Sequence, residues 1–166
     1  NEQQQMLKAS AREFFERECP TTLVRACEES EEGYSHNLWN KMAELGWLGM
    51  MIPPEFGGLG GTFTDLAALF EEMGRFVVPS PFSSTVVLCG IPIIEAGTPD
   101  QKKFFLPKIA AGEAIMALAL TEASAQYTPE SVEVSATTDG TDFIINGTKL
   151  FIEDAHIANY LLCVVR

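Results

Sequence analysis

The sequence changes its periodicity at Ile115-Met116-Ala117-Leu118-Ala119-Leu120-Thr121-Glu122. The first six of these residues form a continuous apolar run, which is typical of a strand covered on both faces. Before this run the sequence predicts helices, and after it short strands. The run ends in a hydroxyl and a carboxylate, on Thr121 and Glu122. We therefore expect a functional site where the two parts meet.

The first part is predicted to be helical because its apolar residues recur every three or four positions. Such stripes, which we interpret as core packing, cover residues 2–18, 21–30, 36–45 and 64–74. Thr21 or Thr22 is expected to cap the second helix and Ser35 the third. Residues 53–61 hold two prolines and four glycines, and predict a compact irregular loop. Their spacing matches no phosphate-binding motif.

The stretch from Thr85 to Ile94 is apolar on nearly all sides. Pro92 disfavours a strand and predicts that a helix bends or restarts there. Such a helix packs in the middle of a bundle or against a bound apolar ligand, and packing is the simpler interpretation. The motif Thr98-Pro99-Asp100-Gln101 then forms a capping box, which predicts another helix, ended by Gly112.

The second part is predicted to consist of strands. They are marked by alternating residues over 132–136, by the apolar runs 143–145 and 150–152, and by a last run over 160–165. Asp139-Gly140 and Asn146-Gly147 predict hairpin turns. Four or five strands with open edges make a poor finished domain, so we expect a piece of a longer protein.

The composition of the 166 residues narrows the function classes. A net charge of −12 disfavours nucleic acid and anionic membrane surfaces as partners. The sequence has no apolar run long enough for a bilayer and no signal peptide at its start. Four scattered cysteines favour a reduced compartment, the cytoplasm or, in a eukaryote, the mitochondrial matrix. Two well-separated histidines disfavour a metal site.

A series of short motifs gives a more specific indication. In order, these are Leu45-Gly46-Trp47-Leu48-Gly49, Pro54-Glu55-Phe56-Gly57-Gly58-Leu59-Gly60, Glu71-Glu72-Met73-Gly74-Arg75, Ala96-Gly97-Thr98-Pro99-Asp100-Gln101-Lys102, Leu106-Pro107-Lys108-Ile109-Ala110-Ala111-Gly112-Glu113, Leu120-Thr121-Glu122 and Ile145-Asn146-Gly147-Thr148-Lys149. The ordered series resembles the acyl-CoA dehydrogenase family over nearly the whole chain.

The resemblance implies an α+β fold. Residues 1–113 would form a helical N-terminal domain and residues 114–166 part of a β-barrel-like middle domain, with the C-terminal four-helix domain absent from this chain. The implied activity is α,β-dehydrogenation of an acyl-CoA thioester with hydride transfer to FAD. The implied partners are an electron-transfer flavoprotein and further subunits of a homo- or hetero-oligomeric tetramer. The catalytic glutamate would lie outside this chain, so no catalytic residue is assigned here, and we expect these residues alone neither to retain FAD tightly nor to turn over.

The resemblance also implies the residues of the site. Those matching cofactor-binding positions are Leu118, Leu120, Thr121, Tyr127, Phe151, Ile152 and Glu153. Those matching substrate-binding positions are Ser84, Leu88 and again Tyr127.

The sequence departs from the family pattern at two of these positions. Tyr127 stands where a serine commonly meets the cofactor phosphate or CoA, and Glu153 stands where a threonine is usual. A carboxylate beside a flavin would disfavour the anionic reduced form of that flavin. These departures motivate an alternative hypothesis, in which the protein is an FAD-free family member that acts as a structural or regulatory partner subunit.

Overall fold

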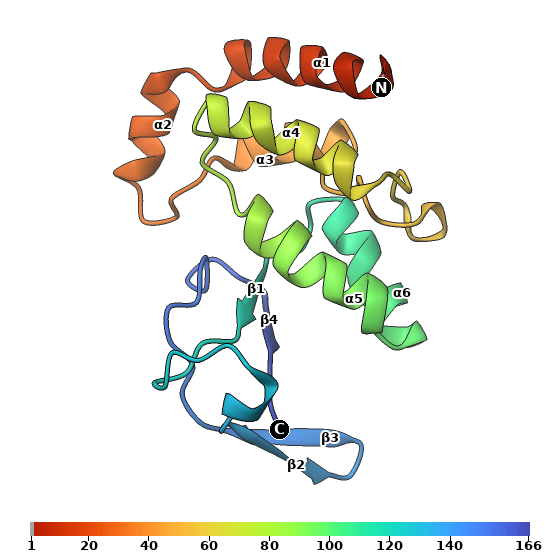
Figure 1. Ribbon diagram of the computed structural model, residues 1–166. Helices are drawn as coiled ribbons and strands as arrows, with labels where there is room; N and C mark the ends of the chain where they lie inside the picture. The colour runs from red at the N-terminus through yellow and green to blue at the C-terminus, as the bar shows by residue number, and fades with distance from the viewer. Residues whose placement is uncertain (1) are drawn as a thin grey trace.

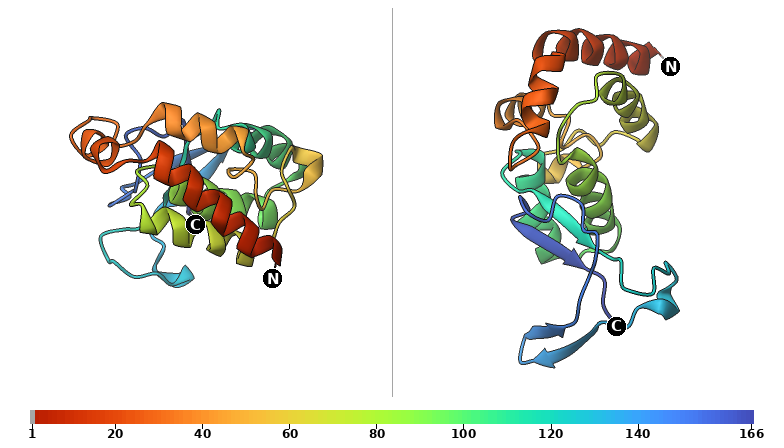
Figure 2. Two further views of the ribbon diagram at one scale, coloured as in Figure 1. Left: turned by 90° about the horizontal axis from the view of Figure 1, so that it is seen from above. Right: turned by 90° about the vertical axis from the view of Figure 1, so that its left-hand side faces the viewer.

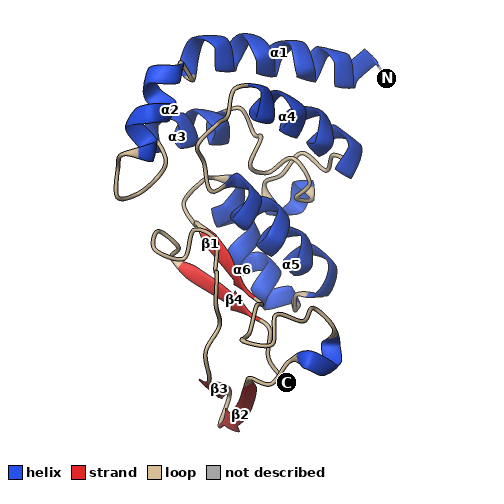
Figure 3. Ribbon diagram, turned by 60° about the vertical axis from the view of Figure 1, so that its left-hand side comes forward, coloured by secondary structure: helices blue, strands red, loops and turns tan. Residues whose placement is uncertain are grey.

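The computed structural model describes residues 2–166, with the helices at one end of the molecule and the strands at the other (Figures 1 and 3). The helices are α1 (Glu2–Glu18), α2 (Thr21–Glu28), α3 (His36–Glu44), α4 (Phe63–Arg75), α5 (Ile91–Ala96) and α6 (Pro99–Ala110), with a π-helix, η2 (Ser83–Gly90), before α5. The strands are β1 (Met116–Ala119), β2 (Ser135–Asp139), β3 (Asp142–Asn146) and β4 (Tyr160–Cys163). Among these residues, none of the helices combines the length and apolar character that a membrane span requires.

The first helix packs along α4 at the top of the molecule, as the view from above shows (Figure 2, left). Its buried Phe15 lies against Trp47, with ring centroids 5.4 Å apart. Beside this aromatic contact, Arg12 of α1 donates to both carboxylate oxygens of the buried Glu72 of α4, at 2.8 and 3.0 Å. Hydrogen bonding by Arg12 holds the pKa of Glu72 below its ordinary value. The Arg12–Glu72 ion pair thus joins α1 to α4, and the aromatic contact joins α1 to the segment after α3.

Helix starts follow the sequence closely except at α2. The Ser35 hydroxyl caps α3, and Thr98 and Gln101 form the predicted capping box of α6. The prediction that Thr21 or Thr22 caps α2 is wrong, because Thr21 is already helical and Pro20 holds the N-cap position without a side-chain bond. Only Cys19 and Pro20 separate α1 from α2, and Pro20, which has an extended backbone, has no side-chain group that could accept a capping hydrogen bond.

The apolar stretch around Pro92 forms η2 followed by α5. Pro92 is the second residue of α5 and lies where the π-helix passes directly into the α-helix, since Gly90 and Ile91 both keep helical dihedrals. The type of helix changes at this point, without the break that a restart would require. The η2 helix packs on β1, and the Thr85 hydroxyl bonds both backbone groups of Met116, at 3.0 and 3.3 Å. The helix that precedes the junction thus supports the first strand directly.

Four strands form two separate pairs. Strands β2 and β3 make the hairpin predicted at Asp139-Gly140, with Gly140 at a φ of 64°. Strands β1 and β4 pair in parallel, with Met116 opposite Tyr160, which the sequence did not reveal. In Figure 3 this parallel pair lies next to the helices and the hairpin lies farther out.

Two strand predictions are wrong. Residues 150–152 are irregular, with Phe151 in the left-handed region at a φ of 52°, so Asn146-Gly147 does not begin a second hairpin. Alternation over 132–134 also gives no strand, since β2 begins only at Ser135. The amides of Leu150, Glu133 and Val134 bond to Thr121 or Glu122, which follow β1, instead of to a neighbouring strand.

The glycine- and proline-rich loop folds back on the segment before it. The Gly60 amide donates to the Ile52 carbonyl at 2.9 Å, and the Gly61 amide donates to the Met50 carbonyl at 2.7 Å. A Cβ atom added to Gly58 would lie 1.9 Å from the same Ile52 oxygen. A glycine at position 58 is thus what allows the loop to close.

Replacing Gly58 with alanine is expected to lower the free energy of unfolding by about 1–3 kcal/mol through this collision. The matched control is Gly74→Ala in α4, where an added Cβ meets nothing within 4 Å. That control is expected to be neutral or stabilising by up to about 1 kcal/mol, since alanine favours helix. Urea unfolding followed by circular dichroism measures both, and wild-type stability of G58A would contradict the prediction.

The buried thiol of Cys89, in η2, reports on the packing between this helix and β4. Burial raises the pKa of Cys89 to about 12, whereas Cys163 in β4 is only partly buried. We expect iodoacetamide at about pH 8 to modify Cys163 well before Cys89 in the folded protein, and both in urea, because the thiolate is the reactive form. Peptide mass spectrometry measures this order, and early modification of Cys89 would show that the packing is wrong.

Candidate functional site

The end of β1 is held by a segment from much later in the chain. The Thr121 carbonyl accepts a hydrogen bond from the Leu150 amide at 2.8 Å. The preceding carbonyl, of Leu120, accepts one from the Lys149 ammonium at 3.2 Å. Residues 149–151 therefore lie alongside residues 120–122, and we call these two segments together the β1 edge.

A buried ion pair completes the β1 edge. Lys149 Nζ lies 2.6 Å from Glu122 Oε1, and each side chain is only 8% exposed. The same carboxylate accepts from the backbone amides of Glu133 at 2.8 Å and Val134 at 3.2 Å. The Lys149 hydrogen bond, together with these amides, lowers the pKa of Glu122. A charged, fully bonded Glu122 thus joins the strand end, the loop that follows and the start of β2.

The side chains around this pair are open to solvent. Phe151 is 93% exposed, Thr121 and Ile152 are half-buried, and Glu153 is exposed. Within residues 2–166, neither the amide nor the hydroxyl of Thr121 has a hydrogen-bond partner. The edge therefore presents an uncovered aromatic ring next to two unused hydrogen-bonding groups.

The structure brings most of the predicted cofactor-binding residues to this edge. Leu120, Thr121 and Phe151 belong to it, Ile152 and Glu153 follow Phe151 directly in the chain, and Leu118 lies two residues before Leu120, in β1. Tyr127 stands apart on the loop after Glu122. Its side chain is 68% exposed and lines a cavity of about 220 Å³ together with Leu120 and Glu122.

The predicted substrate-binding residues lie on η2. Ser84 is fully buried, and its hydroxyl lies 2.5 Å from Asp154 Oδ2 and 3.1 Å from the Pro81 carbonyl. Leu88 is half-buried one turn later. Through Asp154, whose φ is 59°, Ser84 contacts the turn that follows Phe151. The η2 helix is thereby connected to the β1 edge.

Sequence reasoning missed the roles of Lys149 and Asp154 and gave none to Glu122. The sequence held a signal for the Glu122–Lys149 pair. A carboxylate directly after a buried strand needs a cation, and Lys149 ends a short turn motif. Nothing in the sequence paired Asp154 with Ser84, since 70 positions separate them.

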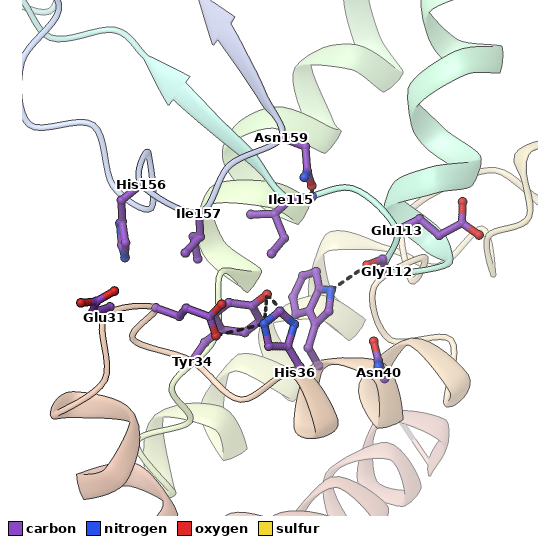
Figure 4. Close-up of a pocket in the computed structure, with 12 residues that line it drawn as sticks. Glu31, Tyr34, His36, Asn40, Gly112, Glu113, Ile115, His156, Ile157 and Asn159 are labelled. Carbon is purple, nitrogen blue, oxygen red and sulfur yellow. Dashed lines mark hydrogen bonds and ion pairs between the residues drawn. The ribbon is translucent and has the colours of Figure 1, made fainter.

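A second cavity, of about 580 Å³, lies between the α2–α3 loop and the start of β1 (Figure 4). His36 hydrogen-bonds to both Tyr34 and Glu32 at its wall, with the Tyr34 hydroxyl 2.9 Å from His36 Nδ1. Trp39 Nε1 donates to the Gly112 carbonyl at 2.9 Å. No group of three potential metal ligands occurs among the described residues. The side chains of Tyr34, His36 and Trp39 already bond to other groups of this wall, and we assign the cavity no chemistry.

Comparison with known proteins identifies the family. The model of the acyl-CoA dehydrogenase N-terminal domain matches residues 1–113. The chain belongs to the acyl-CoA dehydrogenase family. The family resemblance and the α+β fold class predicted from the sequence are therefore confirmed, and the C-terminal four-helix domain of the family is not part of these 166 residues.

Three relatives illustrate the match. Acyl-CoA dehydrogenase FadE12 of Mycobacterium tuberculosis is 37% identical over 80% of this chain and 34% of its own length. The caffeyl-CoA reductase-Etf complex subunit CarC of Acetobacterium woodii is 33% identical over 96% of this chain and 42% of its own. An acyl-CoA dehydrogenase from Bacillus anthracis complexed with FAD has a TM-score of 0.86 and 26% identity, over 100% of this chain and 29% of its own. The chain thus spans about two fifths or less of these relatives.

Proposed function

We propose that this chain supplies part of the FAD and acyl-CoA site of an acyl-CoA dehydrogenase, which oxidises the Cα–Cβ bond of a CoA thioester. The observation that carries the proposal is the Leu150–Thr121 hydrogen bond of 2.8 Å, which sets Phe151 beside Thr121. When bound, FAD supplies the acceptor for the hydride that leaves the β-carbon. The residues of this chain hold and orient that cofactor.

Two features of the β1 edge support a flavin there. The Thr121 amide and hydroxyl offer unused hydrogen-bonding groups for a heterocycle rich in nitrogen and carbonyl acceptors. Phe151, at 93% exposure, offers an aromatic face or edge for the ring system. Leu118, Leu120 and Ile152 add apolar surface around these groups. Glu153 brings a negative charge to the same edge.

Substrate contacts are assigned to η2 and to the loop after Glu122. Leu88 and the region around Ser84 would line the acyl chain, although the Ser84 hydroxyl already contacts Asp154. Tyr127, exposed beside the cavity of about 220 Å³, would meet the CoA or the cofactor phosphate.

The base that removes the α-proton is assigned to another part of the protein. Glu122 is unsuited to this role, because its carboxylate is buried and bonded to Lys149 and two amides. A carboxylate held in its charged form by such partners is a weak proton acceptor.

The electron acceptor of the reduced enzyme is proposed to be an electron-transfer flavoprotein. The name of the relative CarC, a subunit of a reductase-Etf complex, supports this partner. A homo- or hetero-oligomer, as in the tetramers implied by the resemblance, is proposed for the assembled protein.

The test is to purify the complete gene product and record its visible spectrum. We expect flavin absorption that an acyl-CoA bleaches under anaerobic conditions. A colourless protein that binds no added FAD would overturn the proposal and favour an FAD-free partner subunit.

The contribution of Phe151 can be measured in the same protein. We expect Phe151→Ala to raise the Kd for FAD about two- to tenfold, the usual range for losing one aromatic contact. The matched control is Phe63→Ala, whose ring is also exposed, at 62%, but lies at the start of α4. A Kd that is the same in F151A and F63A would remove Phe151 from the site.

A further inference from the structure

We propose that Glu122 and Lys149 are a positioning pair, which aligns Thr121 and Phe151 so that both meet one flavin ring. The proposal rests on the proposed function, because it concerns how the same edge is shaped. Neither side chain is assigned a contact with cofactor or substrate. Their role is to fix the residues that make those contacts.

The geometry brackets Thr121 from both sides. Lys149 Nζ bonds the carbonyl of the residue before Thr121 at 3.2 Å and the carboxylate of the residue after it at 2.6 Å. Between these two bonds, the Thr121 carbonyl takes the Leu150 amide at 2.8 Å. Residues 120, 121 and 122 are thus each bonded to residue 149 or 150. These bonds occupy the carbonyl groups of Leu120 and Thr121 and leave the amide and hydroxyl of Thr121 available.

The second oxygen of the carboxylate extends the effect to the neighbouring loop. Glu122 Oε2 accepts from the Glu133 amide at 2.8 Å, and Val134 donates to Oε1 at 3.2 Å. The loop that carries Tyr127 is therefore fastened at both of its ends by one side chain. Loss of the carboxylate would release this loop and the β1 edge together.

Stability alone does not account for a pair of this kind. Both side chains are about nine-tenths buried, and apolar residues of similar size often stabilise such a position at least as well as an ion pair. What apolar residues cannot supply is direction, since the ammonium and the carboxylate each bond backbone groups at set angles. The pair therefore specifies where three chain segments lie relative to one another.

Matched variants of the complete gene product separate positioning from stability. Lys149→Met and Glu122→Gln remove one charge each, whereas Lys149→Arg keeps the cation. Glu72→Gln removes another buried carboxylate, which is bonded to Arg12 in the helical domain away from the β1 edge. The readouts are the Kd for FAD, the visible circular dichroism of the bound flavin, and the Tm.

We expect Lys149→Met and Glu122→Gln to raise the Kd for FAD at least about tenfold and to change the flavin circular dichroism. The Kd of Lys149→Arg for FAD should lie between that of Lys149→Met and that of the wild type. Glu72→Gln should lower the Tm and leave the Kd and the flavin spectrum unchanged. Amide hydrogen exchange should rise at Leu150, Glu133 and Val134 in the first two variants, with α1 still protected.

The outcomes distinguish this proposal from the function on which it rests. A wild-type protein that binds no FAD overturns the proposed function and the flavin alignment with it. A wild-type protein that binds FAD, with Lys149→Met and Glu122→Gln binding it equally tightly, overturns the positioning role alone. If amide hydrogen exchange rises throughout residues 114–166 of the Lys149→Met variant, this part of the protein has unfolded. The comparison of Lys149→Arg with Glu72→Gln then tests the positioning role. In that comparison, a wild-type Kd in Lys149→Arg despite raised amide exchange at Leu150, Glu133 and Val134 also overturns the positioning role.

Discussion

The architecture of the strand region depends on one buried carboxylate. Glu122 is the first charged residue after an apolar strand, and it is taken out of water with its cation and two backbone amides. A buried charge without partners is strongly unfavourable, so the chain must deliver Lys149 and the amides of residues 133 and 134 to this point. Three segments that are separate in sequence therefore converge on one short stretch, and the solvent-facing residues of the β1 edge take their places from this convergence.

Much of the helical part can be predicted from the sequence, because the residues that start and end its helices act locally. Ser35 and Thr98 act within one turn of the helices they cap, and Pro92 lies where η2 passes into α5. The Asp139-Gly140 turn is local in the same way. The start of α2 is the exception, since Thr21 or Thr22 was expected at the N-cap position and the structure places Pro20 there.

Predictions failed where a distant partner decides the structure. Residues 132–134 and 150–152 have strand-like patterns, yet the amides of Glu133 and Val134 bond to Glu122 and that of Leu150 to Thr121, and Phe151 adopts a left-handed backbone. The family resemblance named Leu120, Thr121 and Phe151 of the β1 edge, because short motifs can be recognised by their order along the chain. It did not reveal the hydrogen bonds among them, or that the Ser84 hydroxyl contacts Asp154, since those depend on three-dimensional closure.

The parallel pairing of β1 with β4 has a consequence for the order of folding. The Ile115 amide and the Asn159 side chain that begin this pairing are 44 positions apart, so a long loop must close before either strand gains a neighbour. Contacts of such separation form slowly compared with helices and hairpins. Strand β1 can join η2 before β4 arrives, because only 31 positions separate Thr85 from Met116. The bonds of Lys149 across the β1 edge span 27 and 29 positions, so this edge can also close before β4 pairs with β1.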